Sequence, residues 1–127
     1  MPRYLITGGA GFIGSNIAHV LAGRGESVRI LDDFSTGRSQ NLAGIDERID
    51  VVRGDLRDPN AVERAVRGVE IVLHQAALNS NPRSIKEPGA TNAVNVDGTV
   101  LLLEAARKAR VRRLVYASSS SVYGELS

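Results

Sequence analysis

Three glycines and two aspartates near the start of the sequence have the types and spacing to bind a nucleotide. Gly8, Gly11 and Gly14 follow one short apolar run, and Asp32 and Asp33 follow a second. Glycines allow a tight turn and a close approach of the backbone to a phosphate, and the free N–H groups of a helix that starts there attract an anion. A carboxylate roughly 20 residues further on can accept hydrogen bonds from the hydroxyls of a ribose. This pattern predicts a dinucleotide site.

Each half of this pattern also has a simpler interpretation. The glycines are spaced G-x-x-G-x-x-G, which differs from the usual G-x-G-x-x-G, and a flexible turn has a similar composition. Asp32 alone fits a solvated acid at a strand end or a helix cap. The combination favours a dinucleotide, and a carboxylate at position 32 would repel a 2′-phosphate. We therefore expect NAD rather than NADP.

The elements that would position these residues alternate along the chain. Helical periodicity at Ile13, Ile17 and Leu21 predicts a first helix, and the pair Asp58 and Pro59 marks the start of another. Strands are predicted at 4–7, 27–31, 49–53, 69–73 and 113–117, and helices at 12–22, 59–67 and 91–109, with a helical turn at 41–45. This alternation predicts an α/β fold, a doubly wound parallel sheet with strand order 3-2-1-4-5 that binds its ligand across the carboxyl ends of the strands.

The helix predicted over 91–109 carries apolar residues around much of its girth, which predicts that it is buried. Gly98 lies inside this stretch. Because glycine within a helix costs about 1 kcal/mol relative to alanine, we expect a packing or functional reason for it.

Composition excludes several kinds of site. The 127 residues suit one domain and contain no cysteine, which excludes a thiol nucleophile and a zinc–thiolate centre. His19 and His74 lie far apart within apolar patterns, so we interpret them as packed or hydrogen-bonded histidines and predict no metal site. Aromatic residues make up 4% and charges of both signs are interspersed, which argues against nucleic acid as a partner. No apolar run reaches the roughly 18 residues of a membrane span, so we expect a cytoplasmic protein with no membrane partner.

Six motifs together resemble the extended short-chain dehydrogenases/reductases, which include NAD-dependent epimerases and dehydratases. They are the segments 7–14, 31–33, 54–56, 74–77, 95–99 and 119–124. Segment 75–84 is most similar to the 4-epimerases of UDP-glucose and UDP-N-acetylglucosamine, and nucleotide-sugar dehydratases and decarboxylases share most of the motifs. The resemblance covers the whole chain and implies a Rossmann-type NAD-binding domain.

The resemblance also implies roles for particular residues. Those expected around NAD are Gly8, Gly11, Phe12, Ile13 and Gly14 at the pyrophosphate, Asp32, Asp33, Ser35, Thr36 and Gly37 at the adenosine ribose, Asp55 and Leu56 at the adenine, and Gln75, Ala76, Ala77 and Asn95 along the nicotinamide half. Ser119 is similar to the catalytic Ser or Thr that hydrogen-bonds the sugar hydroxyl being oxidised. Ser80, Arg83 and Ser120 are expected at the substrate.

Proton transfer in that family depends on a Tyr-x-x-x-Lys pair, in which the lysine lowers the pKa of the tyrosine. None of the three tyrosines, Tyr4, Tyr116 and Tyr123, has a lysine four positions later. We therefore expect residues 1–127 to be the NAD-binding N-terminal part of an epimerase-like protein, truncated after about five strands and inactive alone. A UDP-sugar would bind only to the complete protein.

Other interpretations stay open at this point. The chain could be a stand-alone NAD-binding or redox-sensing module, a fragment of a nucleotide-sugar dehydratase or decarboxylase, or a folded fragment that binds nothing. Truncation would leave the fifth strand as an edge with exposed apolar surface, which predicts self-association, as a dimer.

Overall fold

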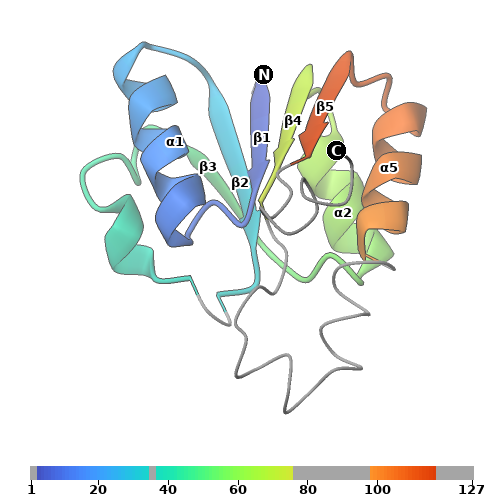
Figure 1. The fold of residues 1–127 in the computed structure, drawn as a ribbon, viewed down its shortest axis with the longest axis horizontal. Helices are drawn as coiled ribbons and strands as arrows, with labels where there is room; N and C mark the ends of the chain where they lie inside the picture. Colours follow the sequence, from blue (N-terminus) through green and yellow to red (C-terminus); the bar gives the residue numbers. More distant parts are fainter. Residues whose placement is uncertain (1–2, 35–36, 76–97, 117–127) are drawn as a thin grey trace, which may run out of the picture.

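A computed structural model of the protein describes residues 3–34, 37–75 and 98–116 (Figure 1). The five strands of its central sheet are β1 (Tyr4–Thr7), β2 (Val28–Asp32), β3 (Asp50–Arg53), β4 (Ile71–His74) and β5 (Arg113–Tyr116). They lie in the order β3-β2-β1-β4-β5, and every neighbouring pair is parallel, so the predicted fold class and strand order are confirmed. β4 starts two residues later than predicted because the N–H of Val69 closes the preceding turn on the carbonyl of Val66, at 3.1 Å.

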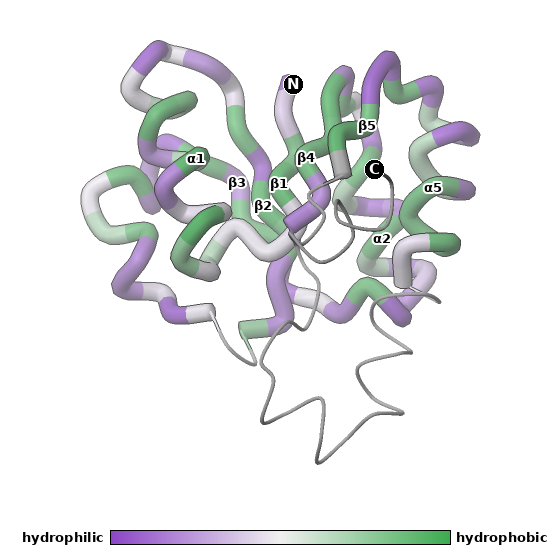
Figure 2. Tube along the Cα trace, in the orientation of Figure 1, coloured by the Kyte–Doolittle hydropathy of each residue, from purple (hydrophilic) through white to green (hydrophobic). Residues whose placement is uncertain are grey.

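Helices cover both faces of this sheet (Figure 1). α1 (Phe12–Gly23) and the short 3-10 helix η1 (Ser39–Leu42) lie on one face, and α2 (Pro59–Val66) and α5 (Gly98–Lys108) lie on the other. The strands supply both layers because alternate side chains point to opposite faces of a sheet. Leu5 packs with the α2 and α5 layer and Ile6 with the α1 layer, and Leu31 and Ile30 repeat this division on β2. The apolar stretches of the chain accordingly converge on the sheet (Figure 2).

Both ends of α2 are fixed by charged side chains. At its start, Asp58 accepts a hydrogen bond from the N–H of Asn60 at 3.0 Å and Pro59 occupies the first turn, as the sequence predicts.

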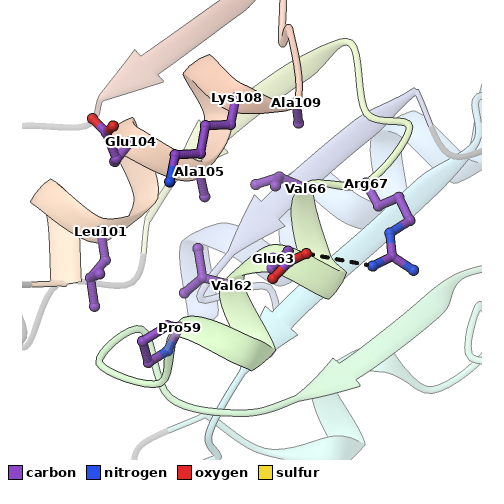
Figure 3. A pocket seen from close by; sticks show the side chains of 10 residues that line it. All are labelled: Pro59, Val62, Glu63, Val66, Arg67, Leu101, Glu104, Ala105, Lys108 and Ala109. Atoms are coloured by element: carbon purple, nitrogen blue, oxygen red, sulfur yellow. Dashed lines mark ion pairs between the residues drawn. The ribbon is translucent and has the colours of Figure 1, made fainter.

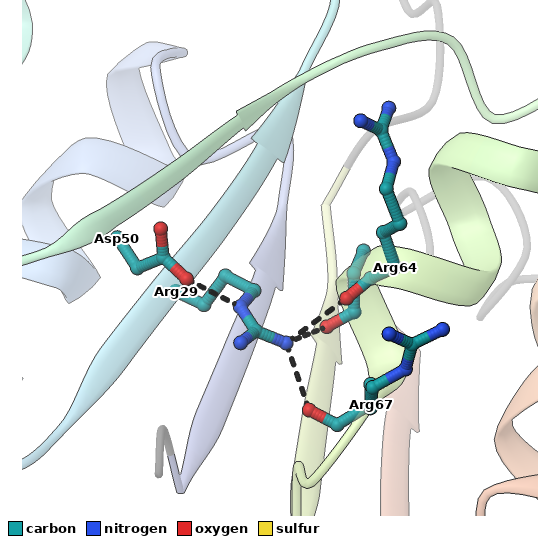
Figure 4. A network of polar contacts seen from close by, with 5 residues as sticks. Arg29, Asp50, Arg64 and Arg67 are labelled. Atoms are coloured by element: carbon teal, nitrogen blue, oxygen red, sulfur yellow. Dashed lines mark hydrogen bonds and ion pairs between the residues drawn. The ribbon is translucent and has the colours of Figure 1, made fainter.

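At the other end of α2, Arg29 of β2 reaches across to the last turn (Figure 4). Its Nη1 donates to the carbonyl oxygens of Arg64, Ala65 and Arg67 at 3.1, 2.8 and 2.8 Å, and its Nε donates to Asp50 at 2.8 Å. Carbonyl groups at the end of a helix have no partner within it, so a cation at this position satisfies them and interacts favourably with the negative end of the helix dipole. Arg29 therefore joins α2 to the sheet.

The structure shows which faces of two helices are buried, and it corrects one expectation. On α1, the apolar residue Ile13 is 61% exposed, and the buried line is instead the small residues Gly14, Ala18 and Ala22. On α5, Leu102 is buried but Val100 is 60% exposed, so the expectation that this helix is buried is wrong for one face of its described part. Ile17 and Leu21 of α1 are partly buried and pack against the core, and α5 packs against α2, the core on this face of the sheet and Leu56.

Within the described ranges no helix combines the length and the apolar character that crossing a membrane requires.

Candidate functional site

The turn between β1 and α1 depends on glycine for its shape. Gly8 has φ of 72°, a conformation that costs glycine little and other residues much more. Its N–H donates to the carbonyl of Leu31 on β2 at 2.7 Å, and the N–H of Gly11 donates back to the carbonyl of Gly8 at 3.1 Å. The turn is therefore tight and attached to the neighbouring strand.

The first turn of α1 is open to a ligand. A Cβ on Gly14 would lie 2.3 Å from the carbonyl oxygen of Gly8, so only glycine allows the helix to start this close to the turn. Gly11 precedes the helix, and among the described residues no side chain caps the helix start and no acid lies in its first turn. The side chains of Phe12 and Ile13 are 79% and 61% exposed. The N–H groups and the positive end of the helix dipole are thus left for an anion.

Asp32 at the end of β2 organises the same turn. It is only 8% exposed, its Oδ2 accepts from the N–H of Ala10 at 2.9 Å, and its Oδ1 accepts from the N–H of Phe34 at 2.7 Å. Phe34 has φ of 61°, which is uncommon outside glycine, and the Asp32 hydrogen bond helps to hold it. A carboxylate has about four lone-pair positions, so two remain for the hydroxyls of a ribose. Asp32, which the sequence predicts to bind the ribose, therefore also holds the backbone at Ala10 and Phe34, a role that the sequence did not reveal.

Ala10 is a second anchor that the sequence analysis missed. Its carbonyl accepts from the N–H of Arg38 at 3.0 Å and from Nδ2 of Asn41 at 2.8 Å. Gly37 lies against it so closely that a Cβ there would be 2.8 Å from the Ala10 carbonyl carbon. The carbonyl of Asn41 in turn lies 2.9 Å from Nε2 of His19, which confirms a hydrogen-bonded role for that histidine. The loop after β2 is thus fastened to the glycine turn.

Asp55 and Leu56 follow β3, and their side chains have different surroundings. The carboxylate of Asp55 pairs with Arg57, with Nη2 and Oδ2 2.6 Å apart, and accepts the Arg57 N–H at 2.8 Å. The hydrogen bond from the Arg57 side chain lowers the pKa of Asp55. Leu56 is buried, and Gly98 at the start of the described part of α5 packs on it. A Cβ on Gly98 would lie 2.8 Å from Cβ of Leu56, which is the packing reason expected for that glycine.

A buried polar chain joins the ends of β1 and β4. Oγ1 of Thr7 lies 2.6 Å from Nδ1 of His74, and Nε2 of His74 lies 2.9 Å from Oγ1 of Thr99 on α5. The N–H of Gln75 donates to Oγ1 of Thr7 at 2.9 Å and to its carbonyl at 3.0 Å. Burial lowers the pKa of His74 from 6.5 to about 4, so the imidazole is neutral near pH 7. His74 is therefore a hydrogen-bonded histidine, as expected.

The structure gathers the described site residues at the carboxyl edge of the sheet, where a ligand of an α/β sheet binds. Those at this edge are Gly8, Gly11, Phe12, Ile13, Gly14, Asp32, Asp33, Gly37, Asp55, Leu56 and Gln75. Ser35, Thr36, Ala76, Ala77, Ser80, Arg83, Asn95, Ser119 and Ser120 lie outside the described residues. In the described ranges no group of three or more His, Cys, Asp or Glu could hold a metal ion.

A groove of about 360 Å³ lies elsewhere, between α2 and α5 (Figure 3). Its walls include the apolar side chains of Val62, Leu101 and Ala105, and its rim carries the ion pair of Glu63 with Arg67 at 3.8 Å. None of the predicted site residues lines it. The candidate site is therefore the glycine turn and the strand ends beside it.

Comparison with known proteins tests this assignment. The model of the NAD dependent epimerase/dehydratase family matches residues 4–127. The chain belongs to this family, whose cofactor is NAD. The open helix start, the glycine contacts that exclude a Cβ, and the spare lone pairs of Asp32 all fit the pyrophosphate and ribose of that cofactor.

Relatives with more than one activity share this part of the family fold. A UDP-glucose 4-epimerase of Streptomyces lividans is 41% identical over 126 residues, which are 97% of this chain and 37% of the relative. The structure of the Thermus thermophilus UDP-glucose 4-epimerase in complex with NAD is 44% identical, with a TM-score of 0.84, and the match covers 92% of this chain and 37% of that one. The dTDP-glucose 4,6-dehydratase of Streptomyces venezuelae, a double mutant solved with NAD bound, is 40% identical with a TM-score of 0.87, over 95% of this chain and 40% of that one. The chain thus spans about two fifths of the length of these relatives.

Proposed function

We propose that residues 1–127 form the NAD(H)-binding domain of a nucleotide-sugar epimerase of the UDP-hexose 4-epimerase type. The observation that carries this proposal is the glycine turn. In it α1 starts against the Gly8 carbonyl without a side-chain cap, and Asp32 holds the same turn through the N–H of Ala10. The similarity to two UDP-glucose 4-epimerases, at 41% and 44% identity, supports the choice among the activities of the family.

The residues of the turn have distinct tasks in this proposal. The N–H groups at Phe12, Ile13 and Gly14 hold the pyrophosphate through hydrogen bonds and the helix dipole. Asp32 accepts the hydroxyls of the adenosine ribose with the lone pairs that Ala10 and Phe34 leave free, and its charge disfavours the 2′-phosphate of NADP. When bound, NAD supplies the hydride acceptor and donor for a transient oxidation of the sugar.

The complete protein would add the remaining machinery. Ser119 and the residues expected at the sugar stay predictions, because they lie outside the described residues. The sequence holds no Tyr-x-x-x-Lys pair, so we expect this chain with NAD to show no turnover of UDP-glucose. Measurable turnover by the pure chain would contradict this part of the proposal.

A second candidate is the same domain of a nucleotide-sugar dehydratase. The 40% identity and TM-score of 0.87 with the Streptomyces venezuelae dehydratase favour it specifically. The two candidates share the NAD site and differ in the sugar chemistry that the complete protein performs. Turnover of UDP-hexoses and of dTDP-glucose by the complete protein would separate them, since an epimerase returns an isomer and a dehydratase releases water.

The decisive experiment for the domain is calorimetric titration of the chain with NAD and, separately, with NADP. Substitution Asp32→Ala is a poor control because it removes the hydrogen bonds to Ala10 and Phe34 as well. Gly14→Ala places a methyl group 2.3 Å from a backbone oxygen, whereas Gly23→Ala, at the end of the same helix, meets nothing within 4 Å.

We expect saturable binding of NAD, weaker binding of NADP, loss of binding in Gly14→Ala and unchanged binding in Gly23→Ala. A folded chain that binds no NAD, or that binds it equally after Gly14→Ala, would overturn the proposal.

We also propose that two copies of the chain associate along β5. β5 is an edge of the described sheet, its Val115 is 46% exposed, and on α5 Val100 and Leu103 are 60% and 48% exposed. Exposed apolar side chains beside an edge strand of the described sheet favour pairing between copies. Light scattering should give a dimer that weakens in Leu103→Glu, and a monomer over a wide concentration range would remove this idea.

A further inference from the structure

His74 is a buried histidine for which the proposed function has no task. Its side chain is 2% exposed and bridges two hydroxyls that come from different layers of the fold, Thr7 at the end of β1 and Thr99 in the first turn of α5. Either neutral tautomer places one hydrogen in each of the two contacts, because a hydroxyl can donate or accept as required. The bridge is therefore complete while the imidazole is neutral.

One end of this bridge reaches the glycine turn. Thr7 is fully buried and directly precedes Gly8, where the left-handed backbone begins the turn. Its hydroxyl is held by His74 and also accepts the N–H of Gln75, which donates to the Thr7 carbonyl too. Thr7 has little freedom left, so its contacts with His74 and Gln75, together with the pairing of β1 and β2, set the direction in which the chain enters the turn.

The other end of the bridge reaches the start of α5. Thr99 is the second residue of the described helix, and Gly98 beside it packs on Leu56, with only 2.8 Å between the position of a Cβ and the Leu56 Cβ. The start of α5 is thus held both by His74 and by the residue that follows β3. Any shift of this helix start moves the partner of Nε2 of His74.

We infer that His74 is a positioning residue for the cofactor site. Through Thr99 and Thr7, it couples the position of the start of α5 to the geometry of the glycine turn. The inference rests on the proposed function for its binding readout. It predicts that a change on α5, at a residue that contacts no part of the glycine turn directly, alters the affinity of that turn for NAD.

Thr99→Val tests the coupling with little change of shape. Valine keeps the volume of threonine and removes the hydroxyl that faces Nε2 of His74, and Thr99→Ser keeps the hydroxyl and serves as the matched control. Calorimetry at pH 7.5, at a temperature where circular dichroism shows each variant fully folded, should give an NAD dissociation constant about five- to tenfold higher for Thr99→Val. Thr99→Ser should remain within about twofold of the parent chain.

A double-mutant cycle tests whether the coupling between Thr99 and the glycine turn passes through His74. If the coupling passes through the imidazole, His74→Gln and Thr99→Val combined should weaken NAD binding by much less than the product of their separate effects. A loss of thermal stability in Thr99→Val with an unchanged dissociation constant would show a purely structural role and overturn the inference. Multiplicative effects in the cycle would overturn it as well.

A second readout does not need NAD. The N–H of Gly8 bonded to Leu31 and the N–H of Gly11 bonded to Gly8 report the turn directly by hydrogen exchange. In the ligand-free chain we expect faster exchange of these two amides in Thr99→Val than in Thr99→Ser. Equal exchange overturns the coupling even if the parent chain fails to bind NAD, so the failure of this inference is distinguishable from the failure of the proposed function.

Discussion

Acidification should destabilise this protein through His74, well above the pH at which most carboxylates are protonated. Burial lowers the pKa of His74 from 6.5 to about 4 in the native state, while the unfolded chain keeps the ordinary value. Between these two values the unfolded chain binds a proton that the native chain does not, so stability is full above pH 6.5 and falls as the pH drops. The window spans about 2.5 pH units, and at about 1.36 kcal/mol per unit the total loss is about 3 kcal/mol.

The prediction can be measured by urea denaturation followed by circular dichroism between pH 7.5 and 5. Over this interval the free energy of unfolding of the parent chain should fall by about 2 kcal/mol more than that of His74→Gln, which cannot titrate. His19→Gln is the matched control, because that imidazole is only partly buried and bonds the carbonyl of Asn41.

Subtracting the two curves removes the contribution of the carboxylates, which is common to both chains. If His74→Gln shows the same fall as the parent chain between pH 7.5 and 5, the native imidazole is not held neutral and the reasoning is refuted. The same follows if His19→Gln abolishes the fall.

Other substitutions have clear expected effects on stability, measured by the same urea denaturation at pH 7.5. Arg29→Ala should cost about 2–3 kcal/mol because it leaves three carbonyls at the end of α2 and a carboxylate without their cation. Arg29→Lys should recover only part of this loss, since an ammonium lacks the planar fork of a guanidinium. An equal stability of both variants would contradict this account. Gly98→Ala should cost about 1–3 kcal/mol despite the better helix propensity of alanine, because its Cβ would meet Leu56 at 2.8 Å. Gly23→Ala, which meets nothing within 4 Å, should be neutral or stabilising, and a similar cost at both glycines would refute the packing argument. Asp58→Ala should cost about 1 kcal/mol through loss of the cap on α2, and an unchanged midpoint would show that the cap is not needed.

The sequence predicts the secondary structure well because the signals for strands and helices lie in neighbouring residues. Apolar runs, helical periodicity and the Asp58 and Pro59 start are properties of a few neighbouring residues, and they predict the strands and helices. The strand order follows from the fold class that their alternation indicates. The long helix predicted over 91–109 was misjudged for burial, because periodicity shows which residues share a face and not whether another element covers it. Val100 and Leu103 stay exposed for this reason.

The sequence by itself determined the glycine turn and the acid at the end of β2, since glycine adopts the left-handed backbone of Gly8 at little cost and no Cβ fits at Gly14. The tertiary structure decided what Asp32 does with its two oxygens and what holds the turn in place. Thr7 and Thr99 lie 67 and 25 residues from His74 along the chain. Such partners meet only after the sheet has formed and α5 has packed against it, so no local pattern could have paired them.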